Sequence, residues 1–243
     1  MEQLLEAPVR PGRKDTTAMF DRIARRYDLL NRVLSFRRDT AWRRRMGRHL
    51  PTRTNQIVLD LATGTADVLI ELYRGTGKVS RGIGLDLSAN MLALGRAKIL
   101  RDGLGDRLTM LRGDASRLGF ADDGFDAVTM AFGIRNVADV PGTLREIHRV
   151  LRPQGRALIL EFSLPRNPLI RAGYLSYFRY VLPRIGGLIS GDTEAYRYLN
   201  SSVEGFPHGE AFCSLLRGAG FLDVKAFPMT LGIATLYQGD TGT

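Results

Sequence analysis

Three short turns, each carrying an acid, follow three apolar segments of the chain. The first reads Asp60-Leu61-Ala62-Thr63-Gly64-Thr65-Ala66-Asp67, the second Gly84-Leu85-Asp86 and the third Gly113-Asp114-Ala115. A carboxylate about twenty residues after a glycine turn, as Asp86 is, can accept hydrogen bonds from both hydroxyls of a ribose. Asp114 would then lie beside the adenine ring of the same ligand. The spacing therefore predicts a nucleoside-binding site.

The turn after Asp60 departs from the pattern of dinucleotide-binding enzymes. Its small residues Ala62, Gly64 and Ala66 let the backbone approach a ligand, but the turn lacks the full G-x-G-x-x-G. Asp67 stands at the start of the next helix, where an acid would repel a phosphate and tolerate a sulfonium or an amine. These residues favour a methyltransferase that uses S-adenosylmethionine over a nicotinamide-dependent oxidoreductase. A binding module without activity would not need so complete a cofactor site.

The elements around these turns alternate between strand and helix. Apolar runs predict strands at 56–62, 81–87, 107–114, 125–132, 155–163, 221–227 and 232–238. Helices are predicted at 67–74, 88–101, 140–151 and 209–218. Such alternation implies parallel βαβ units in an α/β, doubly wound, Rossmann-like sheet of seven strands. The closing hairpin would make the last strand antiparallel.

The 243 residues suit one domain with additions. Residues 1–15 are polar and predict a flexible leader, and residues 16–243 form the single domain. Within it, 16–53 has helical spacing and is expected to form an N-terminal cap, with a second helix that carries Trp42 and Met46 and ends before Pro51. Residues 164–208 interrupt the alternation with aromatic and leucine-rich sequence, and we expect an insertion on the substrate side.

The net charge of +10 is concentrated in one region. Residues 22–53 contain eleven arginines and two acids, which predicts an anionic partner: nucleic acid, an acidic membrane surface or a phosphorylated ligand. A solvated helical face is the alternative. No apolar run reaches the ~20 residues of a membrane-spanning helix, and the first residues do not resemble a signal peptide.

The single cysteine and the three histidines do not indicate a metal site or a disulfide. The single cysteine, Cys213, excludes an intramolecular disulfide, suits a reducing cytoplasm and is expected in the core. The histidines His49, His148 and His208 show no metal-binding spacing, so we expect no metal site. His208 follows Phe206-Pro207 near the presumed substrate side and is one candidate for a general base.

Further motifs make the chain resemble the ubiquinone/menaquinone biosynthesis C-methyltransferases over residues 17–238. They read MFDRIARRYDLLN (19–31), RGDA (112–115), FGIRNV (132–137), RVLRPQG (149–155), LEFSLP (160–165), YRYLNSSV (196–203) and GFLDV (220–224). The resemblance implies a class I methyltransferase that binds S-adenosylmethionine through Gly64, Thr65, Asp86, Asp114, Ala115 and Ala131. Because many relatives have serine at position 131, Ala131 would contact the cofactor through its backbone.

The resemblance also implies the substrate, a polyprenylated quinol methylated at a ring carbon. The turn T-G-T-A-D is closer to menaquinone-only relatives, so demethylmenaquinol is expected, with the benzoquinol intermediate of ubiquinone biosynthesis as the alternative. An RNA or DNA methyltransferase is a more distant alternative, because the fourth strand ends in A-F-G-I-R-N instead of a motif such as N-P-P-Y. We therefore expect no nucleic-acid partner.

The reaction needs electron density on the ring and exclusion of water. Arg135 is the first catalytic candidate, as a cation that would stabilise a quinolate, with an ion pair to Glu161 as the alternative role. Asn136 would hydrogen-bond its neighbourhood or a quinol oxygen. Tyr27, Tyr196 and Tyr198 are expected around the substrate, with Tyr27, Asp28 and Asn31 in the cap over the cofactor.

A polyprenyl tail lies in the membrane, which gives the charged and apolar regions a common interpretation. The arginines of 22–53 would hold the enzyme at an anionic inner leaflet, and the apolar segment 168–190 would cover the tail or contact lipid. A helix packed on the sheet is the alternative for 168–190. We therefore predict a cytoplasmic, peripheral membrane protein; the sequence leaves its oligomeric state open.

Overall fold

The computed structural model describes residues 17–19, 21, 22, 24, 32, 35, 38–181, 184 and 201–242. The predicted leader 1–15 lies outside this part of the chain, as do Tyr27, Asp28, Asn31, Tyr196 and Tyr198. Of the predicted N-terminal cap, the structure describes the second helix and a few residues of the first.

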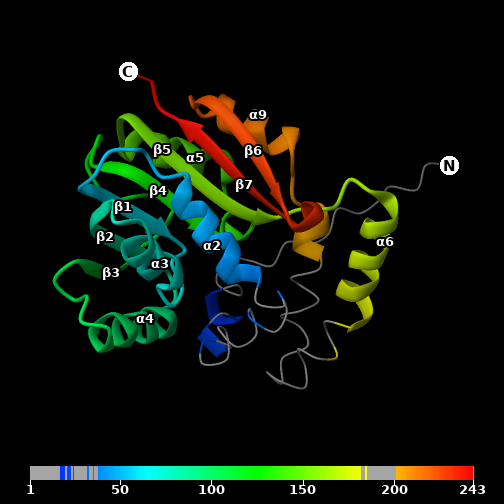
Figure 1. Cartoon of the computed structure of the whole chain (residues 1–243), viewed down its shortest axis with the longest axis horizontal. Helices are drawn as coiled ribbons and strands as arrows, with labels where there is room; N and C mark the ends of the chain where they lie inside the picture. The colour runs from blue at the N-terminus through cyan, green and yellow to red at the C-terminus, as the bar shows by residue number, and fades with distance from the viewer. Residues whose placement is uncertain are drawn as a thin grey trace.

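A single seven-stranded sheet forms the centre of the molecule (Figure 1). Its strands are β1 (Gln56–Leu61), β2 (Val79–Asp86), β3 (Leu108–Arg112), β4 (Phe125–Ala131), β5 (Leu151–Phe162), β6 (Leu222–Met229) and β7 (Ala234–Asp240). They lie in the order β3-β2-β1-β4-β5-β7-β6. The pairs among β1 to β5 are parallel, whereas β7 is antiparallel to both neighbours. The predicted doubly wound sheet with an antiparallel last strand is confirmed.

Helices cover both faces of this sheet. They are α2 (Arg38–Arg48), α3 (Asp67–Thr76), α4 (Ala89–Arg101), α5 (Val140–Val150) and α9 (Glu210–Gly218), whereas α6 (Pro168–Ser176) stands to one side of the sheet (Figure 1). Three short helices join them: η1 (Ile134–Asn136), the π-helix η2 (Tyr177–Val181) and η3 (Thr230–Gly232). The helix predicted from Trp42 and Met46 is α2, in which both side chains are buried. No helix among these described residues is long and apolar enough to cross a bilayer.

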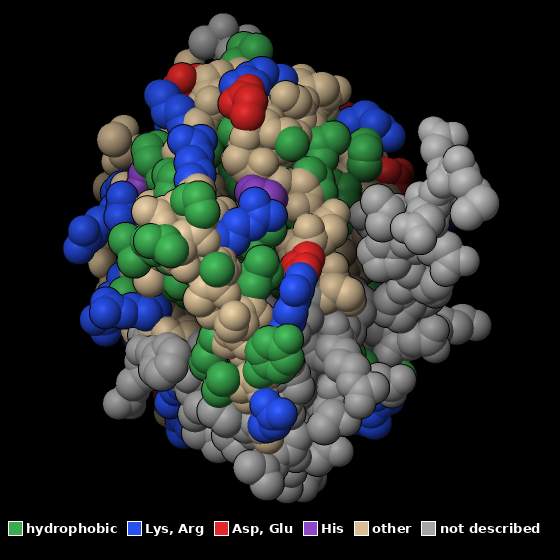
Figure 2. All heavy atoms as spheres, turned by 90° about the vertical axis from the view of Figure 1, so that its right-hand side faces the viewer, with side chains coloured by type: hydrophobic (Ala, Val, Ile, Leu, Met, Phe, Trp, Pro, Cys, Tyr) green, Lys and Arg blue, Asp and Glu red, His purple; other side chains and the backbone are tan. Residues whose placement is uncertain are grey.

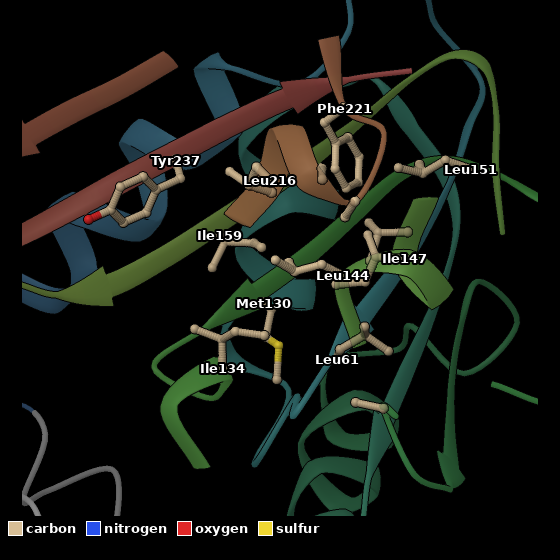
Figure 3. Close-up of a cluster of buried hydrophobic side chains, with 14 of the residues drawn as sticks. Leu61, Met130, Ile134, Leu144, Ile147, Leu151, Ile159, Leu216, Phe221 and Tyr237 are labelled. Carbon is tan, nitrogen blue, oxygen red and sulfur yellow. The ribbon is translucent and has the colours of Figure 1, made fainter. Parts of the chain in front are cut away.

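Two hydrophobic cores lie on the two faces of the sheet. Successive residues of a strand point to opposite faces, so Ala157 and Ile159 of β5 pack into one core while Leu158 and Leu160 pack into the other. The first core is closed by α5 and α9 (Figure 3) and contains Cys213, the expected core cysteine. The second is closed by α2, α3 and α4. Both faces are thus covered, as a parallel sheet requires.

Strand β5 starts earlier than its apolar pattern predicts. It pairs with β4 from Leu151 onward. A register shift between Phe125 and Ala127 leaves residues 152–155 of β5 without partners on β4. The predicted helix 140–151 consequently ends at Val150.

The strand order reverses between β1 and β4, and this reversal positions the site. Chain connections leave β1 and β4 toward opposite faces of the sheet, so a crevice opens beyond the carboxyl ends of the two strands. The turns that carry Gly64, Asp86 and Asp114 all begin at this edge.

Candidate functional site

A cleft with an empty volume of about 830 Å³, including the solvent at its mouth, lies at this crevice. Segments that follow β1, β2, β3 and β4 line it, together with Thr17 from the N-terminal segment. The predicted site residues among its lining are Gly64, Asp86, Asp114, Ala115, Ala131 and Asn136. The cleft has the size of a small-molecule site and combines apolar walls with a few polar groups.

The turn after β1 needs its small residues for a conformational reason. Ala62, Gly64 and Ala66 all have left-handed backbones, with φ of 48°, 56° and 66°. Bulky side chains are strained in this region, whereas glycine is free and alanine is tolerated at some cost. The loop after β4 approaches the turn closely, because a Cβ on Gly133 would lie 2.5 Å from the Cβ of Ala62. The cleft floor is therefore two backbones in contact.

Asp86 is held in place by the backbone. One carboxylate oxygen accepts a hydrogen bond from Gly64 N at 2.8 Å, and the other accepts from Ser88 N at 2.9 Å. Burial raises the pKa of Asp86, while the N–H groups of Ser88 and Gly64 lower it. The Leu87 N–H also bonds this carboxylate, and of its roughly four acceptor positions at least one is left for a ligand hydroxyl in the cleft.

The loop after β3 forms another wall. Asp114 accepts a hydrogen bond from Ser116 N at 3.0 Å, and the neighbouring lining residues Leu87, Met91 and Ala115 offer apolar surface. A flat heteroaromatic ring with exocyclic donors fits such a wall. These residues, with Asp86, suit the adenosine part of S-adenosylmethionine.

Two charged side chains of α5, Arg149 and Glu146, hold this loop through hydrogen bonds to its backbone. Arg149 donates to the carbonyls of Leu118 and Phe120 at 3.0 and 2.8 Å, and it pairs with Glu146 at 2.8 Å. Glu146 in turn accepts a hydrogen bond from Leu118 N at 2.8 Å. The loop that carries Asp114 and Ala115 has little secondary structure of its own, so these bonds define its path.

Thr65 and Asp67 face away from the cleft. Lys98 donates to the Thr65 hydroxyl at 2.8 Å and to Asp67 at 2.7 Å, and Arg43 donates to the other Asp67 oxygen at 2.9 Å. Thr65 is not among the residues that line the cleft. Its hydroxyl is bonded to Lys98, so the predicted contact with the cofactor would have to come from its backbone. The carboxylate of Asp67 is therefore held by two cations of the protein itself, Arg43 on α2 and Lys98 on α4.

Asp60 is a functional candidate to which sequence reasoning assigned no role. It is 1% exposed and accepts hydrogen bonds from the hydroxyls of Thr63 and Thr129, both at 2.6 Å. Burial raises its pKa to about 6, against the lowering by the two hydroxyls. The carboxylate thereby ties β1, the glycine turn and β4 together. Its place directly before the turn was the only signal, and its partner on β4 lies 69 residues away.

Arg135 forms the ion pair with Glu161 that was its alternative role. The two side chains meet at 2.6 Å and are 6% and 1% exposed. Arg135 also donates to the carbonyl of Phe132 at 2.9 Å and lies 5.4 Å from the centre of the Phe162 ring. Burial raises the pKa of Glu161, and the neighbouring guanidinium opposes that rise. Arg135 is not among the lining residues, whereas Asn136, next to it in η1, is.

The N-terminal segment reaches the same cleft. Asp21 accepts hydrogen bonds from the Ser88 hydroxyl and from Asn90 N, beside the start of α4. Thr17, four residues earlier, lines the cleft. The sequence predicts a cap over 16–53, and its helical spacing alone does not distinguish Asp21 from the other polar residues there. His208 is absent from the lining, and its ring lies 3.4 Å from the carbonyl of Phe206. Within the described residues, no group of His, Cys, Asp and Glu could hold a metal ion.

Comparison with known proteins agrees with this geometry. The chain is 46% identical over 222 residues to the ubiquinone/menaquinone biosynthesis C-methyltransferase UbiE of Geotalea uraniireducens, covering 91% of this chain and 94% of the relative. It is also 46% identical over 223 residues to the demethylmenaquinone methyltransferase of Thermus thermophilus, covering 91% and 99%.

Solved structures show the same fold at low sequence identity. One is a possible histamine N-methyltransferase of Thermotoga maritima, described as dependent on S-adenosylmethionine, with a TM-score of 0.63, 19% identity and coverage of 92% and 98%. Another is a phosphoethanolamine N-methyltransferase of Haemonchus contortus in complex with S-adenosylmethionine, with a TM-score of 0.61, 17% identity and coverage of 82% and 51%. The ubiE/COQ5 methyltransferase family matches residues 10–240, and this chain belongs to that family of S-adenosylmethionine-dependent methyltransferases.

Proposed function

We propose that this methyltransferase transfers a methyl group from S-adenosylmethionine to a ring carbon of a polyprenylated quinol, most closely demethylmenaquinol. The observation that carries the proposal is Asp86, whose carboxylate faces the cleft with both oxygens fixed by backbone N–H groups. The names of the relatives support the substrate class, and the demethylmenaquinone methyltransferase of Thermus thermophilus supports the choice within it.

Five residues would hold the cofactor. Asp86 would bind the ribose hydroxyls, Asp114 and Ala115 would flank the adenine, and the turn at Gly64 and the backbone of Ala131 would face the methionine part. The cofactor supplies an electrophilic methyl group on its sulfonium. The chain must then place the quinol carbon in line with that methyl group and exclude water.

The substrate side depends on the segment 132–138. We infer that the Arg135–Glu161 pair holds η1 so that Asn136 presents its amide to a quinol oxygen. Arg135 also supplies positive charge near a ring that becomes anionic when its hydroxyl loses a proton. Glu161 offsets part of that charge, so the pair acts mainly on the geometry of η1. Tyr27, Tyr196 and Tyr198 remain predicted substrate contacts.

The direct experiment is a labelled-methyl assay with purified protein. Demethylmenaquinol, the demethylated benzoquinol and RNA are offered in parallel with S-adenosylmethionine. We expect label in the naphthoquinol, and demethylmenaquinone should accumulate in a strain that lacks the gene. Label only in the benzoquinol would move the function to the ubiquinone branch, and label only in RNA would refute the quinol substrate.

The substrate's tail also requires access to a membrane, and we propose that the protein works peripherally at an anionic leaflet. Among the described arginines of 38–53, two groups can be distinguished. Arg43, Arg44 and Arg53 pair with the protein's own acids Asp67, Glu71 and Asp126. Arg38, Arg45 and Arg48 of α2 are exposed and can contribute long-range attraction.

A further inference from the structure

Helix α6 has one face in the protein and one in water. Its inner residues Tyr174 and Leu175 pack, with Tyr177 of η2, against Leu164, Val203 and Ile233. On the outer side, Leu169 is 84% exposed and Tyr180 of η2 is 61% exposed. Exposed single leucines are ordinary, but exposed apolar side chains at both ends of one amphipathic helical segment are typical of an interfacial helix.

A leucine from a distant part of the sequence stands next to α6. Leu231 of η3 is 72% exposed, and a Cβ on its neighbour Gly232 would lie 3.4 Å from the Cα of Pro165, just before α6. Leu231 has a φ of 59°, a left-handed backbone that leucine rarely adopts. The fold therefore holds a large apolar side chain in water, in a strained conformation, next to the glycine that approaches the backbone of Pro165 and Arg166.

The charged residues of the segment that contains α6 are all cationic. Residues 164–191 contain four arginines, Arg166, Arg171, Arg179 and Arg184, and no acid. All four are exposed, and Arg179 pairs with Glu204 of a later segment. Figure 2 shows the side of the molecule that carries α6, with hydrophobic and cationic side chains side by side and few acidic ones. We call Arg166, Leu169, Tyr180, Val181 and Leu231 the α6 face.

We propose that the α6 face docks on the surface of an anionic lipid bilayer. Leucine and tyrosine would enter the headgroup region, and the arginines would pair with lipid phosphates. This inference rests on the proposed function, because a membrane-dissolved polyprenyl tail needs a protein face at the bilayer. A second copy of the chain fits less well, since a two-fold contact would place the cationic face against itself.

The position of α6 links this face to the site. Tyr174, on the inner side of the helix, is buried and lies within electrostatic reach of Arg135 and Glu161. One helix therefore separates the proposed bilayer contact from the ion pair that supports η1 and Asn136. A ring drawn from the bilayer would pass from this helix toward η1, whose Asn136 lines the cleft, while its tail stays at the lipid surface.

The test measures partition of the full chain onto phosphatidylcholine vesicles with and without phosphatidylglycerol. We expect binding to the anionic vesicles only, weakened by salt. The double variant Leu169→Glu with Leu231→Glu should lose at least tenfold in partition. Leu100→Glu is the matched control, because Leu100 on α4 is 71% exposed and lies outside the α6 face. Arg166→Gln should weaken partition about fivefold, and the control Arg107→Gln, at an exposed arginine outside the α6 face, should not.

Unchanged partition of the double variant would overturn the proposal, as would binding to neutral vesicles to the same extent. Light scattering can also overturn it: a wild-type dimer that Leu169→Glu dissociates would mean that a second copy of the chain covers the α6 face.

Methylation of a short-tailed, water-soluble naphthoquinol separates this proposal from the proposed function. We expect the double variant to match the wild type there. Vesicle binding without this activity would refute the quinol substrate alone, and activity without vesicle binding would refute the docking face alone.

Discussion

The amide of Gly64 donates a hydrogen bond to the Asp86 carboxylate at 2.8 Å, which ties the tip of β2 to the turn after β1. The acid that would bind the ribose and the turn that would approach the methionine part are therefore one preorganised unit. Ligand binding at such a unit loses little conformational freedom, because the acceptor is oriented in advance.

Substitution of Asp86 should remove cofactor binding without unfolding the protein. We expect Asp86→Ala to weaken S-adenosylmethionine binding by about 100-fold, because two hydrogen bonds to a charged acceptor are lost at about 1.5 kcal/mol each. Isothermal calorimetry measures the change. Asp106→Asn, at an exposed acid in the loop before β3, is the control. Equal affinity of wild type and Asp86→Ala would contradict the assignment of the ribose site.

Asp60 should make stability depend on pH in a direction opposite to that of most acids. Its folded pKa of about 6 lies above the ordinary value of 3.8, so the folded state binds more protons between these values. The stabilisation is complete below the unfolded pKa and is lost as the pH rises through 6, by about 3 kcal/mol in total. Asp60→Asn should abolish this loss while its amide keeps partners in Thr63 and Thr129.

Urea unfolding of wild type and Asp60→Asn across this pH range tests the point. The difference in the free energy of unfolding between the two proteins should change by about 3 kcal/mol between acid and neutral pH, with the variant relatively more stable at neutral pH. A constant difference would show that Asp60 does not titrate there.

The Arg135–Glu161 pair should separate stability from turnover. Arg135→Ala leaves Glu161 as a buried, unpaired charge and should cost about 3 kcal/mol or more of stability. Arg135→Met combined with Glu161→Gln removes both charges and should restore much of that loss. Both variants should bind S-adenosylmethionine in calorimetry and lose most quinol turnover. Turnover of the double variant near the wild-type rate would remove this pair from the mechanism.

Arg149 should act on cofactor binding from outside the cleft. Arg149→Ala releases the carbonyls of Leu118 and Phe120, so the loop with Asp114 and Ala115 loses its anchor. We expect the KM for S-adenosylmethionine to rise about tenfold, with kcat much less affected. Arg145→Ala, at an exposed arginine of the same helix, is the control. A fall in kcat at unchanged KM would assign Arg149 another role.

Local patterns were sufficient to predict the fold and which residues line the candidate site. Apolar alternation, the helical repeat and the small residues of the turn are properties of neighbouring residues. They predicted the seven strands of the sheet. They also predicted that Asp86 and Asp114 lie together at the carboxyl edge of that sheet. These signals are reliable because side-chain direction within a strand or helix follows from backbone periodicity alone.

Tertiary structure alone decided which side chains pair. Asp60 meets Thr129 across 69 residues, Trp42 donates to Thr230 across 188, and Lys98 draws Thr65 and Asp67 to the far side of the turn. Likewise, the position of Leu231 beside the start of α6 follows from how β7 and β5 pair. Such contacts depend on the packing of whole elements, and linear spacing carries no record of which distant side chains that packing brings within hydrogen-bond distance.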